Sequence, residues 1–258
     1  MFTVFGIVLA AVLLYLLFIL PTQWLKVERV RVDLGLHKKV LQLSDLHMER
    51  VRVLPNQLKK LIEKEKPDYI FLTGDFLDTE PALLRLKEYL SALSGPPVIP
   101  RYAVLGNHDY RLPKVKRLID VLQSGGVCVL RNEAVDLGDF VLLGIDDYGT
   151  YHDNAAKAYR DLDETQVRKT HIVLQHDPNY VLENTWPFDY LLSGHLHGKQ
   201  LNLPFIFWIQ NMGPLPRMGI YKGLHTCPQG PYYISKGIGQ SGWNVRFLVR
   251  SEVTVHEV

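Results

Sequence analysis

The stretch LLSGHLHGKQ, residues 191–200, places two histidines directly after an apolar run and a Ser-Gly turn. The run from Asp189 to Leu192 is typical of a buried strand, so His195 and His197 lie where a strand passes into a loop. Taken alone, an H-x-H pair is more often a surface or loop feature than a metal site. Its meaning therefore depends on what the rest of the chain brings to the same place.

Apolar strand-like runs alternate with helical patterns from residue 27 onward, which predicts an α/β fold built from crossover units. Helical patterns occupy residues 55–66, where Leu54, Leu58, Leu61 and Ile62 share one face, and residues 80–93 and 113–126. Strand-like runs occupy residues 39–45, 69–75, 101–109, 127–130, 133–137, 140–146, 171–177, 189–195 and 232–237, and the alternation in 243–258 indicates antiparallel strands. These strands exceed the needs of one doubly wound sheet, so we expect two packed sheets with outer helices.

Polar clusters follow five of these strand-like runs. They are SDLH with Asp45 and His47, TGDFLD with Asp75 and Asp78, GNHD with Asn107 and His108, QHD with His176, and GHLH with His195 and His197. Each cluster alone is readily explained as a turn, a helix cap or a surface histidine. In open α/β sheets, however, ligands bind outside the carboxyl ends of the strands, so five such clusters can converge on one point.

This ordered series resembles the calcineurin-like metallophosphoesterase family, whose blocks run D-x-H, G-D, G-N-H-[DE], H and G-H-x-H. The resemblance extends from residue 38 to about residue 250 and is greatest to the membrane-associated bacterial branch, which includes some UDP-diacylglucosamine pyrophosphatases. It implies a four-layer α/β/β/α sandwich. It also implies a two-metal hydrolase of a phosphodiester or pyrophosphate bond, with a lipid or nucleotide-linked substrate.

The resemblance also implies the metal ligands. One ion would be held by Asp45, His47, Asp75 and His197, and the second by Asp75, Asn107, His176 and His195, so that Asp75 bridges the two. Carboxylate, imidazole and amide ligands without a thiolate suit divalent Mn²⁺ first, with Fe, Zn²⁺ or Co²⁺ as alternatives. Two such ions about 3.5 to 4 Å apart activate a water and hold phosphoryl oxygens during in-line displacement.

His108 matches the histidine of the family that is not a metal ligand and that stabilises transition-state charge or protonates the leaving oxygen, with Asp78 orienting it. Thr79 stands where the phosphoprotein phosphatase branch, G-D-x-x-D-R-G, has its phosphate-binding arginine. This departure argues against a phosphoprotein phosphatase. Candidate phosphate-binding residues, each of which has the alternative of a solvated surface charge, are Arg50, Arg111 and Lys199.

The N-terminus predicts a membrane anchor over residues 1–25, followed by a metallophosphoesterase domain over residues 26–258. The first 25 residues carry no charged side chain, and the apolar run 4–20 gives about 25 Å of helix. A cleaved signal peptide is disfavoured because neither a basic start nor an A-x-A-like exit is present. Positive charges follow the span at residues 26, 29, 31, 38 and 39, so we expect a single-pass protein of the cell membrane with a cytoplasmic catalytic domain.

Composition leaves two rivals open, a metal-dependent nuclease and a non-catalytic scaffold of the same fold. The chain of 258 residues has a net charge of +2 and no block of basic residues, which argues against a nucleic-acid partner. A scaffold would lack ligands, whereas all seven are present here together with His108. Cys128 and Cys227 lack the spacing of a zinc site.

Two further segments have open interpretations. The apolar run from Phe205 to Ile209, with Trp208, is either a core strand with its turn or a lip that faces lipid. The stretch GIDDYG, with Asp146, Asp147 and Tyr148, is a candidate loop beside the metal ligands.

Overall fold

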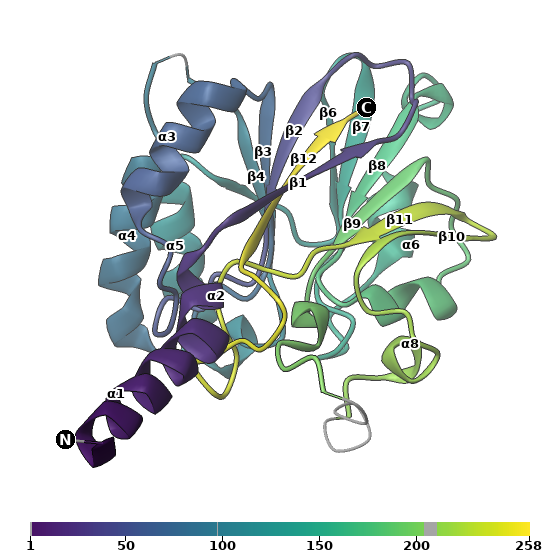
Figure 1. The fold of residues 1–258 in the computed structure, drawn as a ribbon. Coiled ribbons are helices and arrows are strands. Elements are labelled where there is room, and N and C mark those ends of the chain that lie inside the picture. Colours follow the sequence, from purple (N-terminus) through teal and green to yellow (C-terminus); the bar gives the residue numbers. More distant parts are fainter. Residues whose placement is uncertain (1, 97, 204–210) are drawn as a thin grey trace.

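The computed structural model describes residues 2–96, 98–203 and 211–258. Two six-stranded sheets pack against each other, and helices cover their outer faces (Figure 1). The predicted α/β class and the α/β/β/α order of layers are therefore confirmed. The aromatic run at 205–209 lies outside the described residues.

The first sheet has the strand order β1-β12-β2-β3-β4-β5. Its strands are β1 (Lys26–Arg31), β2 (Lys39–Leu43), β3 (Tyr69–Thr73), β4 (Arg101–Val104), β5 (Cys128–Val129) and β12 (Glu252–Glu257). Strands β2 to β5 are parallel, β12 is antiparallel to β2, and β1 is parallel to β12. The carboxyl ends of β2, β3 and β4 therefore share one edge with the start of β1.

The second sheet has the order β10-β11-β9-β8-β7-β6. Its strands are β6 (Glu133–Asp136), β7 (Phe140–Gly144), β8 (Thr170–Leu174), β9 (Tyr190–Ser193), β10 (Gly223–Cys227) and β11 (Gly230–Ile234). The central strands β7, β8, β9 and β11 are parallel, while β6 and β10 are antiparallel partners at the two edges. Their interior runs are almost wholly apolar, as expected for parallel strands covered on both faces.

Three apolar clusters hold the layers together. Helices α3 (Pro55–Glu65), α4 (Leu83–Ala92) and α5 (Val115–Ser124) pack on the first sheet, and α6 (Ala155–Arg160) and α8 (Pro214–Arg217) lie with the cluster on the outer face of the second. Between the sheets, Phe71 and Val104 of the first meet Phe140, Ile172 and Leu192 of the second. Burial of this apolar surface fixes the sheets relative to each other and so aligns their carboxyl edges.

The structure differs from the sequence-based expectation in two places. Leu54 precedes α3 as its N-cap and is 60% exposed, so only Leu58 and Leu61 of the predicted face are buried. In the predicted strands of residues 243–258, only β12 forms a strand. Phe247 instead stacks on Phe18, with ring centroids 5.1 Å apart, so the alternation before β12 reflects packing on the N-terminal helix.

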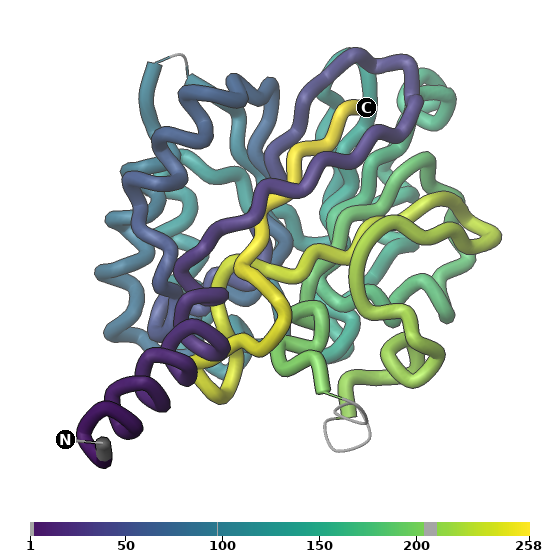
Figure 2. The backbone as a smooth tube through the Cα atoms, viewed as in Figure 1, coloured from purple at the N-terminus to yellow at the C-terminus, as the bar shows by residue number. Residues whose placement is uncertain are grey.

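The N-terminal apolar segment is helical. It runs through α1 (Phe2–Leu14), a π-helical turn (Tyr15–Ile19) and α2 (Leu20–Gln23). Residues Thr3–Gln23 are long and apolar enough to cross a membrane, and none of the apolar window is buried against the domain. Figure 2 shows this helix projecting from the domain beside the segment that precedes β12. Since β1 begins at Lys26, the helix joins the domain at the carboxyl edge of β2.

Candidate metal centre

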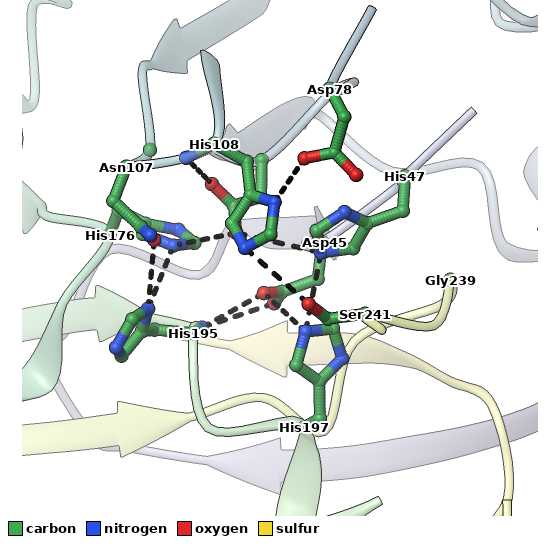
Figure 3. A network of polar contacts seen from close by, with 12 residues as sticks. Asp45, His47, Asp78, Asn107, His108, His176, His195, His197, Gly239 and Ser241 are labelled. Carbon is green, nitrogen blue, oxygen red and sulfur yellow. Dashed lines mark hydrogen bonds and ion pairs between the residues drawn. The ribbon is translucent and has the colours of Figure 1, made fainter. Parts of the chain in front are cut away.

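The loops that leave five strands carry the seven predicted metal ligands. Asp45 and His47 follow β2, Asp75 follows β3, Asn107 follows β4, His176 follows β8, and His195 and His197 follow β9. The two sheets thus contribute predicted ligands from both sides of one point, and Figure 3 shows six of the seven side chains pointing toward one another: Asp45, His47, Asn107, His176, His195 and His197. The structure brings together every ligand that the sequence predicted.

Five of these residues have a left-handed backbone. Their φ angles are 53° at Asp45, 40° at His47, 55° at Asp75, 69° at His195 and 48° at His197. Outside glycine, positive φ is uncommon and strained, and Asn, Asp and His tolerate it best. The ligand types are therefore also the types best able to make the sharp turn at a strand end. This concentration of strain at one edge is typical of a functional site.

Asp45, His47 and His197 form the first group of predicted ligands. The Nε2 atoms of His47 and His197 are 3.3 Å apart, and the His197 Nε2 lies 3.5 Å from the Asp45 carboxylate. The His47 Nε2 also lies 3.5 Å from the Asp75 carboxylate. Asp45, His47 and His197 are close enough to hold one ion, and Asp75 lies beside this group at His47.

Asp75, His176 and His195 form the second group. The His176 Nε2 lies 3.3 Å from the same Asp75 oxygen, Oδ2, that faces His47. The His195 Nδ1 lies 3.3 Å from the His176 Nε2 and 3.1 Å from the Asn107 amide oxygen. Asp75 therefore stands between two clusters of nitrogen and oxygen donors, as a bridging ligand would.

Hydrogen bonds behind the ligands fix their orientation. The His176 Nδ1 lies 2.7 Å from the Thr73 carbonyl oxygen, so it donates its proton there and the ring is turned with Nε2 facing Asp75. Asp45 accepts hydrogen bonds from the Ser44 hydroxyl, at 2.6 Å, and from the His195 backbone N–H, at 3.1 Å. His176 and Asp45 are thus held before any ion binds.

Backbone conformation and close packing explain three glycines of the motifs. Gly74 has φ of +80°, and a Cβ on Gly106 would lie 2.3 Å from the Asp75 carboxylate. A Cβ on Gly194 would lie 1.9 Å from the Ser44 hydroxyl oxygen. The glycines allow the three ligand loops to approach one another.

Burial and neighbouring charges shift the pKa values of the predicted ligands. It lowers the pKa of His47 to about 3 and, together with the neighbouring His47, holds the pKa of His197 well below its usual range. Burial alone would raise the pKa of Asp75, but the His176 charge and hydrogen bond, with His108 and His47, hold it well below the ordinary value. Burial would lower the pKa of His176, but the charge and hydrogen bond of Asp75, with the charge of Asp45, hold it well above the ordinary value, so a bound ion would displace that proton. Neutral His47 and His197 beside an ionised Asp75 have the protonation states that a metal requires, so the residues present fit divalent ions.

His108 lies beside the ligands without belonging to either group. Its Nδ1 contacts the Asp78 carboxylate, and its Nε2 points into the site, 3.9 Å from Asp75 and 3.4 Å from the Ser241 hydroxyl. Burial would raise the pKa of Asp78, but hydrogen bonds from His108 and Arg50 lower it. An ionised Asp78 therefore orients the imidazole.

A cavity of about 530 Å³ opens in front of the ligands. Two of the predicted phosphate-binding residues lie at its wall and pair with Asp78, Arg50 at 2.7 Å and Arg111 at 3.5 Å. Lys199 also lines it, with its ammonium 4.7 Å from the Tyr221 ring centroid. The cavity thus joins the metal ligands to cationic groups suited to an anionic substrate.

The two carboxylates of the GIDDYG loop, Asp146 and Asp147, have different surroundings. Asp147 is fully buried, and burial raises its pKa, while the charges of His176 and His195 oppose that rise. Asp146 instead accepts hydrogen bonds from Tyr110, at 2.5 Å, and Arg131, at 2.8 Å. Asp147 thus interacts electrostatically with two predicted ligands, whereas Asp146 pairs with Tyr110 and Arg131.

Sequence reasoning missed three residues that organise the site. Asp109 stood in the GNHD motif without a role, yet its buried carboxylate accepts four backbone N–H groups from the ligand loops. Gln200 exchanges hydrogen bonds with the backbone of Ser241, which faces His108. No local signal marks Gln200 or Ser241, because both act through contacts that are distant in sequence.

Two packed sheets with Asp and His clusters at their carboxyl edge define a metallophosphoesterase. The chain belongs to the calcineurin-like phosphoesterase family, whose model matches residues 38–199. This family binds two divalent metals, and membership identifies the chain as a phosphoester hydrolase.

Three relatives show the range of the family around this chain. It is 41% identical over 251 residues to the uncharacterized metallophosphoesterase YkoQ of Bacillus subtilis, covering 92% of each chain. It is 29% identical to the phosphodiesterase YaeI of Escherichia coli, covering 85% of this chain and 82% of the relative. It is 25% identical to the UDP-2,3-diacylglucosamine pyrophosphatase LpxG of Chlamydia muridarum, covering 84% and 82%.

Proposed function

We propose that this chain is a two-metal hydrolase of a phosphodiester or pyrophosphate bond. The supporting observation is the single Asp75 oxygen that lies 3.5 Å from the His47 Nε2 and 3.3 Å from the His176 Nε2. In the proposal, Asp45, His47, Asp75 and His197 hold one ion, and Asp75, Asn107, His176 and His195 hold the other. Mn²⁺ is the metal we propose, on the chemistry of these ligands.

The residues around the ligands have separate roles in this proposal. Bound divalent ions would supply Lewis acidity toward phosphoryl oxygens and lower the pKa of a bound water. His108 donates a hydrogen bond or a proton to the leaving oxygen from its Nε2, while Asp78 holds the opposite ring nitrogen. Arg50 and Arg111 attract and orient the anionic substrate at the cavity wall.

The substrate class and the location are proposed together. The phosphodiesterase and pyrophosphatase names of two relatives support a lipid or nucleotide-linked substrate. We propose that residues 1–25 anchor the protein in the cell membrane and that residues 26–258 form the catalytic domain. Lys26, Arg29 and Arg31 directly follow the apolar helix, which supports a cytoplasmic position for that domain.

The metal assignment is tested with Asp75→Asn in the full-length protein in detergent. The variant loses one negative charge shared by both groups, so it should retain fewer than two ions per chain by elemental analysis and lose hydrolysis of bis-p-nitrophenyl phosphate. Asp136→Asn is the matched control, because Asp136 lies in the edge strand β6 and pairs with Lys169. Two tightly bound ions in Asp75→Asn would contradict the ligand assignment.

The substrate class is tested with a panel assayed with added Mn²⁺. It contains bis-p-nitrophenyl phosphate, a phospholipid, a nucleotide-diphospho-lipid and single-stranded DNA. The proposal expects turnover of the first substrate and of at least one lipid. Preferential cleavage of the DNA would favour the nuclease alternative, and no turnover with two ions bound would favour a non-catalytic scaffold.

A further inference from the structure

The segment Ser241–Leu248 lies between the catalytic cavity and the apolar N-terminal helix. At one end, the Ser241 hydroxyl is 3.4 Å from the His108 Nε2, and Trp243 lines the cavity. At the other end, the Arg246 N–H donates to the Phe18 carbonyl at 3.0 Å. We name this segment the rim. In Figure 1 it is part of the yellow chain that lies beside α2.

The rim contacts the helix before the helix ends. Phe18 lies five residues before Gln23, which is about 7.5 Å along the helix at 1.5 Å per residue. The span Thr3–Gln23 has 21 residues, about 31 Å, which matches the thickness of a hydrocarbon core. If Thr3–Gln23 fills the hydrocarbon core of a bilayer, the Phe18 contact with the rim lies about 7.5 Å inside the hydrocarbon boundary, so the rim reaches from the interface to the first acyl carbons.

The side chains exposed on the rim suit that position. Trp243 is 74% exposed and Leu248 is 66% exposed, although both are large apolar residues. At the base of the helix, Trp24 is 57% exposed and carries the Arg250 guanidinium 3.8 Å above its ring centroid. Exposed tryptophan beside arginine is typical of a membrane interface, where the ring meets the acyl boundary and the cation meets phosphate.

Hydrogen bonds from Gln200 hold the rim against the loop that follows β9. The Gln200 amide nitrogen donates to the carbonyl oxygens of Ser241 and Trp243, both at 2.8 Å, and its amide oxygen accepts from the Ser241 N–H at 2.9 Å. Gln200 directly follows the GHLHGK block of the metal ligands. The position of Trp243 is therefore fixed relative to the metal ligands and not only to the helix.

We propose that the face formed by Trp24, Trp243 and Leu248 lies on a phospholipid bilayer, and that the cavity receives the phosphate of a lipid still seated in that bilayer. The inference rests on the proposed hydrolase function and names the substrate class of the same site. Arg50 and Arg111 lie at the cavity wall and meet the headgroup phosphate, while Trp243 contacts the acyl or glycerol portion. The helix and the rim together set the depth at which the metal ligands face the bilayer.

Depth-dependent quenching tests the contact directly in the full-length protein. The protein is reconstituted in phosphatidylcholine vesicles with 20 to 30% phosphatidylglycerol, with and without acyl-brominated phosphatidylcholine. The chain has four tryptophans, so the difference between the wild type and Trp243→Phe isolates one of them. We expect Trp243 to lose at least half of its emission in brominated vesicles.

Trp186→Phe is the matched control. Trp186 is 38% exposed and stacks on Tyr159, and it precedes β9, at the opposite edge from the metal ligands. The emission of Trp186, obtained as the difference between the wild type and Trp186→Phe, should fall little in brominated vesicles. Equal quenching of the two components, or none for Trp243, would overturn the docking inference, whereas the Asp75→Asn metal and hydrolysis assays would still stand or fall separately.

A kinetic test uses Leu248→Ser, which changes the docking face outside the cavity. Hydrolysis of soluble bis-p-nitrophenyl phosphate should stay within twofold of wild type, while kcat/KM for vesicle lipid falls by about tenfold. An equal fall on both substrates would mean that the rim acts on the fold alone. Unchanged hydrolysis of both substrates would contradict a contact between Leu248 and the membrane.

Discussion

Replacement of Asp109 by asparagine tests how the ligand loops are held together. One oxygen of the buried Asp109 carboxylate accepts from the N–H groups of Phe76, at 2.8 Å, and Leu77, at 3.3 Å. The other accepts from Asp75, at 3.0 Å, and Gly106, at 2.9 Å. Burial and the Asp75 charge raise the pKa of Asp109, and the N–H donors oppose that shift because they favour the ionised form.

Asparagine can replace only one of these two oxygens. Whichever way the amide turns, its NH₂ group faces two buried N–H donors and leaves both without an acceptor. Each unpaired buried donor costs about 1 to 3 kcal/mol, so Asp109→Asn should lower the free energy of unfolding by about 2 to 6 kcal/mol. The variant should also bind Mn²⁺ about 10- to 100-fold more weakly, because the loops carrying Asp75 and Asn107 are no longer fixed.

The assay is urea unfolding of the metal-free protein in detergent, followed by circular dichroism, together with calorimetric titration of Mn²⁺. The matched control is Asp163→Asn. Asp163 also accepts backbone N–H groups, from Thr165 at 2.8 Å and Gln166 at 2.9 Å, but it is exposed and water can replace those bonds. Equal loss of stability in the two variants, or unchanged Mn²⁺ affinity in Asp109→Asn, would refute the reasoning.

Three further predictions concern other buried groups. His108→Asn should keep both ions yet lower kcat by about 10² to 10⁴, and a smaller loss with a better leaving group would identify proton donation, since such a group needs no acid. Arg246→Lys should destabilise the protein by about 2 to 4 kcal/mol in urea unfolding, because the buried guanidinium donates to three carbonyls of residues 236–239. Burial lowers the pKa of His256 to about 3, from about 6.5 in the unfolded chain, so its contribution to stability is present above pH 6.5 and is lost as the pH falls. Between pH 7.5 and 5 the free energy of unfolding of the wild type should fall by about 2 kcal/mol more than that of His256→Gln. Parallel pH profiles of the two proteins would show that His256 is not held neutral.

The sequence determined the composition of the site. Asp and His residues follow strand-like runs at five places, and both the apolar periodicity and the turn chemistry that mark strand ends are local properties. The carboxyl ends of parallel strands share one edge, so the convergence of Asp45, Asp75 and Asn107 at one sheet follows from the sequence pattern, whereas His195 joins them only because the second sheet packs against the first. The N-terminal helix could also be predicted, because it is a continuous run of apolar residues.

Tertiary structure alone decided how the site is held and what surrounds it. Asp109 and Gln200 act on backbone groups of other loops, and Ser241 meets His108 across 133 residues of sequence. The left-handed backbone of the ligands is likewise imposed by surrounding packing, since an isolated strand end would relax it.

The segment that leads into β12 shows why local patterns fail there. Its apolar alternation resembles a strand, yet Phe247 packs on Phe18 and Arg246 is buried beneath the 236–239 loop. A local pattern records which side chains avoid water but not which surface covers them. That choice is made when the sheets and the N-terminal helix come together, because only then do residues far apart in the chain compete for the same apolar surface.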